Sequence, residues 1–335
     1  MTPVIEPVFG PQAVAVAVSS DAGYAPYLAT TLSSLIAQAS PGRFYDLIVM
    51  GLNLGERDAG LIRSMAGGRD NISIRIFEIS EFIDQHDFFV NAHVSKATYS
   101  RLLFPDFFSL YSKLLYLDVD LAVLKDVADL FDIDLENQAL GVVRDYYAVK
   151  DLPLKSDAKW AAQLGLKNTE NYFNAGVLLM NLERLRAENF EKQWFDELAR
   201  VKKPRLHDQD ILNAVCEGRV KFIDPCWNCQ AWNESLGETI TPADLPAELY
   251  AQYQAAKKSP GIIHYVSHNK PWNLPHLDLA EHFWQAARAT PYYEKMLYAN
   301  LKYLNNENDL IKARVLFPPT RLKLWLYKLL AALTT

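Results

Sequence analysis

Apolar and polar positions alternate along the first third of the chain in the order typical of alternating strands and helices. The continuous apolar run from Ala13 to Val18 is typical of a buried strand in a parallel sheet, and the segment from Tyr27 to Gln38 carries apolar residues at helical spacing. A strand at Tyr45 to Leu52, a helix at Glu56 to Met65 and a strand at Ile72 to Ile76 follow. This β-α-β-α-β order predicts an α/β protein that begins like a nucleotide-binding fold.

The rest of the chain continues the mixed pattern and becomes helical near its end. The 335 residues, 50% of them hydrophobic, are enough to bury a large core. We expect a domain over residues 1–275 and a helical C-terminal extension over residues 276–335. The further strands predicted are Leu140 to Val143, Ala175 to Met180 and Ile262 to Val266, and the further helices are His93 to Leu103, Ile211 to Val215, Ala280 to Ala289 and Tyr292 to Leu301.

Two carboxylates end an apolar run in the middle of the chain. Leu114 to Leu117 is typical of a buried strand, and Asp118 and Asp120 follow it directly. A buried carboxylate needs a cation or hydrogen-bond donors to compensate its charge. On extended backbone, side chains two residues apart point to the same face, so this pair can bind one hard divalent ion through its oxygens. The alternative interpretation is a strand that ends in a polar turn.

Charge and motifs exclude several classes of function. The formal net charge is -6, from 34 basic and 40 acidic residues, so no overall positive field attracts nucleic acid. The chain has no G-x-G-x-x-G and no G-x-x-x-x-G-K-[ST], which disfavours a dinucleotide site and a P-loop. The N-terminus has no basic start and only a short apolar run, so we expect a cytoplasmic protein.

The three cysteines, Cys216, Cys226 and Cys229, are too few for a disulfide framework in a chain of this length. Cys226 and Cys229 have the C-x-x-C spacing of a redox pair or of half a zinc site. No second such pair and no thioredoxin-like context accompany them. We therefore interpret them as ordinary thiols in a packed segment.

Other polar residues follow the predicted strands, where open α/β sheets bind ligands. Asp21 comes after the first strand, and Arg101 precedes the acidic pair, where a basic residue can bind a diphosphate or a sugar hydroxyl. A surface ion pair is the alternative for Arg101, and a core position is the alternative for His264. Asp208 and Asp210 precede an apolar helix, whose free N–H groups an aspartate can cap. That role explains one of the two carboxylates and leaves the other unassigned.

Six motifs occur in order between about Val14 and Asn273. They are Tyr24-Ala-Pro-Tyr27 after Asp21, Thr98-Tyr-Ser-Arg-Leu102, Leu115-Tyr-Leu-Asp-Val-Asp120, Phe173-Asn-Ala-Gly-Val-Leu-Leu179, Asp208-Gln-Asp-Ile-Leu-Asn213 and His264-Tyr-x4-Lys-Pro-Trp272. Together they resemble glycosyltransferase family 8, which contains bacterial lipopolysaccharide galactosyl- and glucosyltransferases and the glycogenins. The resemblance implies a GT-A fold, which is a Rossmann-like mixed sheet flanked by helices.

The resemblance also implies a reaction. A galactose or glucose unit would move from a UDP-sugar donor to a saccharide acceptor with retention of the anomeric configuration, in lipopolysaccharide or other surface glycan synthesis. Manganese, with magnesium as the near competitor, would be held by Asp118, Asp120 and His264. The ion would neutralise the donor diphosphate and stabilise the departing UDP, and Lys270 would add positive charge at the same phosphates.

Further site residues are carried over from the family by position. Asp145 corresponds to a residue between donor and acceptor. Gln209 lies where a nucleophile is expected, but a neutral amide is a poor nucleophile, so we favour same-face attack assisted by the leaving phosphate. Asp210 is the second candidate for a catalytic carboxylate. Ser267 and Gly23 replace a glycine and an asparagine that are common in the family. The expected donor-binding residues are Asp21, Tyr24, Arg101, Asn174, Asp208, Ser267 and Lys270.

Two other classes of function remain as alternatives. A haloacid-dehalogenase-like phosphatase also places D-x-D after an apolar strand, but its pattern has Thr or Val where Ala122 stands. A catalytically inactive protein that binds sugar nucleotides would share the fold. The choice of acceptor is expected in the loops over residues 150–171 and 224–261, which carry no recognisable motif.

The C-terminal segment differs in charge from the rest of the chain. No acidic residue follows Asp309, whereas basic residues continue, and leucines recur at helical spacing within the segment from Arg321 to Leu333. One interpretation is a terminal helix packed on the domain. Our hypothesis is that this segment lies on the inner face of the cytoplasmic membrane, beside a lipid-linked acceptor.

Overall fold

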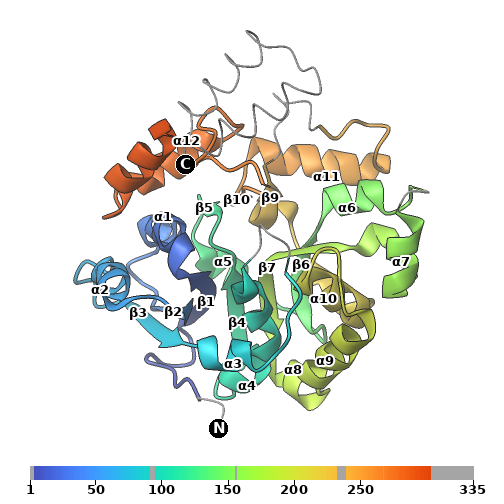
Figure 1. Ribbon diagram of the computed structural model, residues 1–335, viewed down its shortest axis with the longest axis horizontal. Helices are drawn as coiled ribbons and strands as arrows, with labels where there is room; N and C mark the ends of the chain where they lie inside the picture. Colours follow the sequence, from blue (N-terminus) through green and yellow to red (C-terminus); the bar gives the residue numbers. More distant parts are fainter. Residues whose placement is uncertain (1–3, 91–94, 155–156, 232–238, 267, 303–335) are drawn as a thin grey trace, which may run out of the picture.

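The fold is built on a seven-stranded mixed β-sheet (Figure 1). The computed structural model describes residues 4–90, 95–154, 157–231, 239–266 and 268–302. β7 is antiparallel to both of its neighbours, and the other adjacent strands pair in parallel. This confirms the predicted α/β fold with a mixed sheet. The strands, in spatial order, are β3 (Ile72–Glu78), β2 (Tyr45–Leu52), β1 (Val14–Asp21), β4 (Lys113–Leu117), β7 (Phe173–Asn181), β6 (Leu140–Arg144) and β8 (Val220–Phe222).

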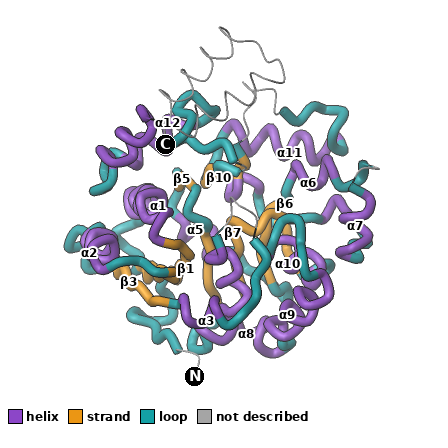
Figure 2. The backbone as a smooth tube through the Cα atoms, in the orientation of Figure 1, coloured by secondary structure: helices purple, strands orange, loops and turns teal. Residues whose placement is uncertain are grey.

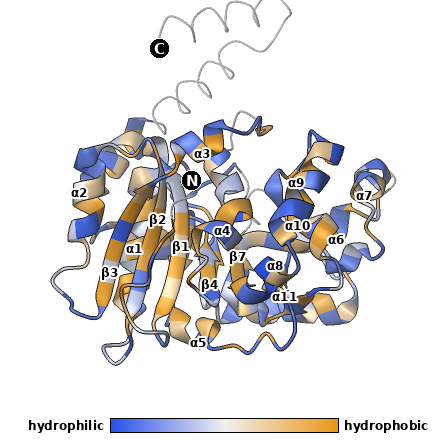
Figure 3. Ribbon diagram, turned by 90° about the horizontal axis from the view of Figure 1, so that it is seen from below, coloured by the Kyte–Doolittle hydropathy of each residue, from blue (hydrophilic) through white to orange (hydrophobic). Residues whose placement is uncertain are grey.

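The central strands form the interior of the molecule because most of their residues are apolar on both faces. Every residue of β2 is buried, and β1 is buried up to Asp21. Strands of this kind need cover on both faces of the sheet. Figure 2 shows the strands in the middle of the molecule with helices around them. Figure 3 shows hydrophobic residues gathered along the strands, whereas the outer helices carry polar faces.

The helices confirm most of the predicted positions, with changes at their ends. The segment predicted as a helix from His93 to Leu103 contains a 3-10 helix over Lys96–Leu103, and Ser95 caps it by accepting a hydrogen bond from the Ala97 N–H. The α-helices are α1 (Ala25–Gln38), α2 (Glu56–Ser64), α3 (Ser80–Asp84), α4 (Phe104–Phe107), α5 (Val127–Phe131), α6 (Tyr146–Asp151), α7 (Ala158–Leu164), α8 (Leu182–Ala187), α9 (Phe190–Val201), α10 (Asp208–Cys216), α11 (Ala247–Lys258), α12 (Ala280–Ala287) and a helix that includes residues 293–302.

A second, three-stranded sheet joins distant parts of the chain. Its order is β5 (Leu121–Val123), β10 (Ile262–His264) and β9 (Cys229–Gln230). β10 pairs antiparallel with β5 and parallel with β9. Because β5 follows β4 after a short bend, this small sheet lies at the carboxyl end of the central strands.

The described part of the C-terminal extension packs on the domain that precedes it. Phe283, Tyr292 and Met296 belong to the hydrophobic core, and α12 lies against α1. Two side chains of the extension also hold the segment after Lys270: Trp284 Nε1 donates to the Pro271 carbonyl oxygen, and Asn300 Nδ2 donates to those of Trp272 and Asn273. The division at residue 275 stays a prediction.

The predicted membrane-binding segment, Arg321 to Leu333, lies outside the described residues. Among the residues that are described, no helix combines the length and the apolarity needed to cross a membrane.

Candidate active site

A cavity of about 990 Å³ lies where β1 and β4 end. Among the described site residues that were predicted, Asp210 does not line it and is buried behind its wall, whereas Ser267 falls outside the described residues. The structure thus brings together residues from six separate motifs. The predicted residues in the wall are Asp21, Tyr24, Arg101, Asp118, Asp120, Asp145, Asn174, Asp208, Gln209, His264 and Lys270.

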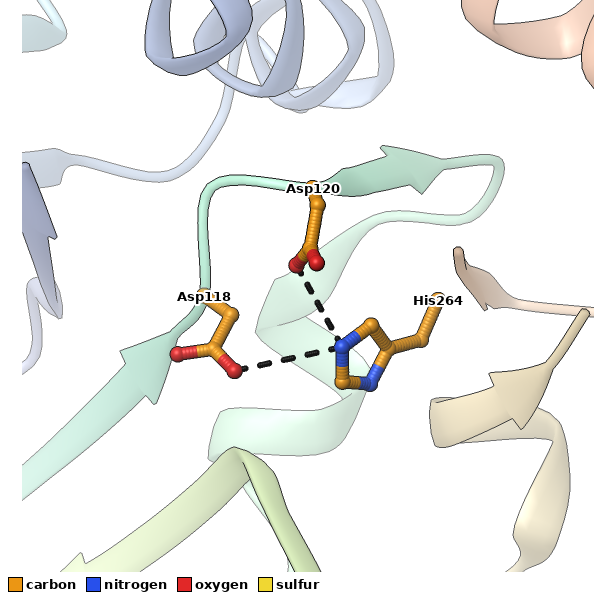
Figure 4. Close-up of side chains that lie close together, drawn as sticks. All are labelled: Asp118, Asp120 and His264. Atoms are coloured by element: carbon orange, nitrogen blue, oxygen red, sulfur yellow. Dashed lines mark ion pairs between the residues drawn. The ribbon is translucent and has the colours of Figure 1, made fainter. Parts of the chain in front are cut away.

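Asp118, Asp120 and His264 converge at one part of this cavity (Figure 4). The two aspartates lie in the bend between β4 and β5, and not on extended backbone as predicted. His264 reaches them because β10 pairs with β5, with His264 opposite Leu121. His264 Nε2 lies 3.3 Å from Asp120 Oδ1 and 3.9 Å from Asp118 Oδ2, and the three ligand atoms lie within 4.8 Å of one another.

Asp120 carries the strongest sign of a cation site. Lys270 Nζ donates to Asp120 Oδ2 at 2.6 Å. Burial opposes ionisation of Asp120, but Lys270 and His264 together outweigh burial and hold the pKa of this carboxyl below its usual range. The second oxygen, Oδ1, is buried and has no hydrogen-bond partner among the described residues. Two carboxylates and one imidazole, with an ionised oxygen left unpaired, fit a divalent metal ion.

Arg101 is a buried cation between two carboxylates. Its guanidinium lies 3.1 Å from Asp118 Oδ1 and 2.8 Å from Asp208 Oδ2, and it stacks over the Tyr116 ring, 4.2 Å from the ring centroid. It also donates to the backbone oxygens of Thr98 and Ala175. The arginine side chain is only 3% exposed, so these contacts fix it in the wall of the cavity.

Asp208 is a partner of Arg101 and not a helix cap. α10 begins at Asp208 after His207, and no side chain caps it, so the predicted capping by Asp208 or Asp210 is wrong. Asp208 Oδ1 instead accepts a hydrogen bond from Thr98 Oγ1 at 2.6 Å. Burial raises the pKa of Asp208 to about 6, and Arg101 and Thr98 oppose that rise.

Asp145, Asn174 and Gln209 form a hydrogen-bonded group in another part of the wall. Asp145 Oδ2 accepts from Asn174 Nδ2 at 3.2 Å and from Gln209 Nε2 at 3.0 Å. Gln209 Oε1 accepts from the Ala175 N–H at 2.9 Å. Both ends of the Gln209 amide therefore contact the protein, which suits a group that orients substrate better than a nucleophile.

Asp210 supports the site from behind. It is fully buried and accepts hydrogen bonds from Trp160 Nε1 at 3.0 Å, Tyr172 Oη at 2.6 Å and the Leu206 N–H at 3.0 Å. Burial raises the pKa of Asp210. Because its carboxylate faces protein donors and not the cavity, the geometry argues against the expected catalytic role and for the positioning of Trp160 and Tyr172.

Asp21 and Tyr24 lie at the end of β1 beside an aromatic group. Asp21 Oδ1 accepts from the Tyr24 N–H at 3.1 Å, which caps a 3-10 helix over Ala22–Tyr24. Tyr27 stacks on Trp272 with ring centroids 3.7 Å apart, and Tyr24 meets both rings edge-on. Burial raises the pKa of Tyr24 to about 12. Aromatic rings of this kind can receive the planar base of a nucleotide.

Two residues of the site were not identified from the sequence. Gly176 has room for no side chain, since a Cβ there would lie 2.2 Å from His264 Cε1 and 2.8 Å from Asp118 Oδ2. Gly176 lies within the motif Phe173-Asn-Ala-Gly-Val-Leu-Leu179, but nothing in the sequence distinguishes this glycine as a site residue. Asn228, whose Oδ1 lies 3.0 Å from His264 Nδ1, is hidden in the C-x-x-C segment that we interpreted as plain packing.

Comparison with known sequences shows which proteins this chain resembles. Residues 15–274 match the sequence model described as Glycosyl transferase family 8. A protein of Haemophilus influenzae, named as a candidate glycosyltransferase, is 30% identical over 260 residues, which are 76% of this chain and 72% of that protein. The lipopolysaccharide 1,3-galactosyltransferase of Salmonella typhimurium is 28% identical over 208 residues, which are 58% of this chain and 55% of that enzyme.

Solved structures show the same architecture. The apo structure of the bifunctional glycosyltransferase WbbM superposes with a TM-score of 0.80 and 27% identity, over 90% of this chain and 54% of that one. The galactosyltransferase LgtC, solved with donor and acceptor sugar analogues, gives a TM-score of 0.70 and 26% identity, over 83% of this chain and 96% of that one. The fold is therefore of the GT-A type found in these glycosyltransferases.

Proposed function

The chain belongs to glycosyltransferase family 8, and from that membership we propose that it is a metal-dependent, retaining hexosyltransferase. It would transfer galactose or glucose from a UDP-sugar to a saccharide acceptor. The observation that carries the proposal is the group formed by Asp118, Asp120 and His264 in the wall of a cavity large enough for a nucleotide sugar. The phosphatase alternative is set aside because its family is not the one matched.

The metal site that we propose takes manganese, with magnesium as the competitor. Asp118, Asp120 and His264 would hold the ion, and no thiolate is among these ligands. When bound, the cation supplies charge neutralisation for the donor diphosphate and Lewis-acid assistance to the departing UDP. Lys270, which lies at Asp120, adds a second positive charge for the same phosphates.

The remaining residues of the wall would orient the two sugars. Asp21 and Tyr24, beside the aromatic group, would receive the uracil, and Asp208 and Asn174 would hold the donor sugar. Asp145 and Gln209, which share a hydrogen bond, would lie between donor and acceptor. Because the amide of Gln209 is a weak nucleophile, we favour attack by the acceptor on the same face that UDP leaves, with the departing phosphate taking the acceptor proton.

The acceptor that we propose is a lipopolysaccharide or other lipid-linked glycan. The support is the similarity to the lipopolysaccharide 1,3-galactosyltransferase of Salmonella and the basic, leucine-rich segment from Arg321 to Leu333. In this proposal the enzyme works at the inner face of the cytoplasmic membrane. Co-sedimentation with anionic liposomes tests the membrane contact, because a chain that ends at Pro319 should bind less than the full chain at low salt.

The reaction is tested by screening UDP-sugars for metal-dependent hydrolysis in the absence of acceptor. UDP release with Mn²⁺ is the expected result, and Asp120→Asn or His264→Ala should abolish it while the circular dichroism spectrum stays unchanged. The loss corresponds to several kcal/mol of transition-state stabilisation. Release of inorganic phosphate would point to a phosphatase, and metal-dependent UDP binding without turnover would point to an inactive binding protein.

A further inference from the structure

Asn228 lies in the Cys226-Trp-Asn-Cys229 segment and touches the histidine of the proposed metal site. It is completely buried and ends a 3-10 helix over Pro225–Asn228 that leads directly into β9. β9 pairs in parallel with β10, so that Cys229 lies opposite Ile263 and Gln230 opposite His264. This pairing brings the Asn228 side chain to the ring of His264, with Oδ1 at 3.0 Å from Nδ1.

The orientation of the Asn228 amide follows from a backbone N–H group. Gly176 N donates to Asn174 Oδ1 at 2.9 Å, and on its other side Asn174 Nδ2 donates to the Asp145 carboxylate. These two contacts fix Asn174 Oδ1 as an acceptor. Asn228 lies 2.9 Å from the same oxygen, so it must present its NH₂ group there and turn its carbonyl oxygen to His264.

The orientation of the Asn228 amide determines which nitrogen of the His264 ring carries the proton. A carbonyl oxygen only accepts, so the His264 nitrogen that faces it, Nδ1, must carry a proton. Nε2 is then free of a proton in the neutral ring, and it is the nitrogen that faces Asp118 and Asp120 (Figure 4). A lone pair on that nitrogen and two carboxylates around one point are what a metal ion needs.

We propose that Asn228 is a positioning residue: it holds His264 as the Nδ1–H tautomer and thereby sets the affinity of the site for a divalent cation. The inference rests on the proposed metal site. It also gives the C-x-x-C segment a role that does not involve its thiols, because the pairing of β9 with β10 requires the segment to lie beside His264.

Binding of Mn²⁺ to the full chain, measured by electron paramagnetic resonance without nucleotide, is the first test. Asn228→Leu keeps the volume and removes the acceptor, and it should weaken Mn²⁺ binding about 10- to 100-fold, as loss of a hydrogen bond behind a metal ligand typically does. Asn228→Asp keeps an acceptor for Nδ1–H and should bind Mn²⁺ within a few-fold of wild type. It should still lose thermal stability, since its carboxylate faces Asn174 Oδ1.

Asn71→Leu is the matched control. Asn71 donates to the backbone oxygens of Ser40 and Arg43 at the start of β3, away from the cavity. Its loss should lower the melting temperature without changing Mn²⁺ affinity. Equal Mn²⁺ affinity in wild type and Asn228→Leu would overturn the positioning role. Absence of Mn²⁺ binding by wild type would overturn the metal site itself, which is a different result.

The tautomer is read directly from the ¹⁵N chemical shifts of the metal-free protein labelled at histidine, at mildly alkaline pH. The spectrum of His264→Gln identifies the His264 signals. Wild type and Asn228→Asp should show Nδ1–H, and Asn228→Leu should shift toward the Nε2–H form. An Nε2–H ring in wild type would overturn the inference, and this measurement decides it even if Asn228→Leu does not fold.

Discussion

Two ion pairs in the wall of the cavity, Arg101–Asp208 and Lys270–Asp120, differ in how exposed they are and in how many partners their cations have. Arg101 and Asp208 are 3% and 2% exposed, and the guanidinium also contacts Asp118 and two backbone oxygens. Lys270 and Asp120 are 11% and 16% exposed, and apart from Asp120 the ammonium contacts one backbone oxygen, that of Tyr265. A planar guanidinium suits a fixed site with several partners, whereas an ammonium is a single point charge. The first pair therefore suits a structural role, and the second is the pair to which we assign a role in the proposed reaction.

Replacing Arg101 should have the largest effect on the free energy of unfolding. Arg101→Met leaves Asp118 and Asp208 without the arginine that pairs with both, and we expect the free energy of unfolding to fall by about 3–5 kcal/mol. Urea denaturation measures it. The control is Arg43→Met, whose partner Asp132 is 55% exposed and whose loss should cost about 1 kcal/mol at most. Equal losses in the two variants would contradict the distinction.

Replacing the lysine of the other pair should change catalysis instead of folding. Lys270→Met removes the positive charge that we propose for the donor phosphates, and we expect donor hydrolysis to slow by about 10²- to 10³-fold. The free energy of unfolding should change by about 1–2 kcal/mol. Initial rates of UDP release and urea denaturation measure the two effects. Lys295→Met, at an exposed position of the helix that includes residues 293–302, is the control and should leave the rate unchanged.

The two pairs should respond to pH with opposite sign. Burial raises the pKa of Asp208 from 3.8 to about 6, so the folded state holds this proton more tightly than the unfolded chain does. Wild type should therefore gain up to about 3 kcal/mol relative to Asp208→Asn as the pH falls through this window, and lose it again as the pH rises. Burial opposes the ionisation of Asp120, but Lys270 lowers its pKa, so the advantage of wild type over Asp120→Asn should shrink as the pH falls below 3.8.

Urea denaturation of the three proteins over a pH series checks both signs. A difference between wild type and Asp208→Asn that stays constant with pH would mean that the Asp208 carboxyl titrates normally. The Arg101–Asp208 and Lys270–Asp120 pairs would then no longer differ in how they make the free energy of unfolding depend on pH.

Adding a methyl group at Gly176, which lies against His264 and Asp118, should give the smallest effect. The Cβ of Gly176→Ala would press on His264 and Asp118, and overpacking of this kind costs about 1–3 kcal/mol. We expect weaker Mn²⁺ binding by calorimetry together with this loss of stability. Gly60→Ala, on α2 with open space around it, is the control and should be neutral or stabilising. Wild-type Mn²⁺ affinity in Gly176→Ala would show that the metal ligands can shift at little cost.

Some of the helices, strands and site residues could be predicted from the sequence, and others could not. The positions of β1 to β3 and of the helices between them follow from the spacing of apolar residues, because the apolar residues of each element are the ones that it buries. Asp118 and Asp120 were found because charge after a buried strand is costly. The partners of these carboxylates could not be found by periodicity. His264 reaches Asp120 only through the pairing of β5 with β10, which joins segments far apart in the chain.

Other failures have local causes. One of Asp208 and Asp210 was expected to cap α10 because aspartates commonly do so, but Asp208 pairs with Arg101 and Thr98, which come from another part of the chain. Asp210 was the second candidate for a catalytic carboxylate because a motif gives the position of a residue and not the direction of its side chain, which here meets donors from Trp160, Tyr172 and Leu206. Asn228 and Gly176 are recognisable only from what they contact, and neither residue type signals a metal site in a sequence.

The hydrogen bonds from Trp284 and Asn300 to the segment after Lys270 bear on the size of the smallest functional unit. A fragment cut after residue 275 would keep all the family motifs, yet it would lose both of these tethers and the core residues Phe283 and Met296. The loop that positions Lys270 would then rest on the rest of the domain alone. The length of chain needed to hold Lys270 in place is therefore greater than the length over which the family can be recognised.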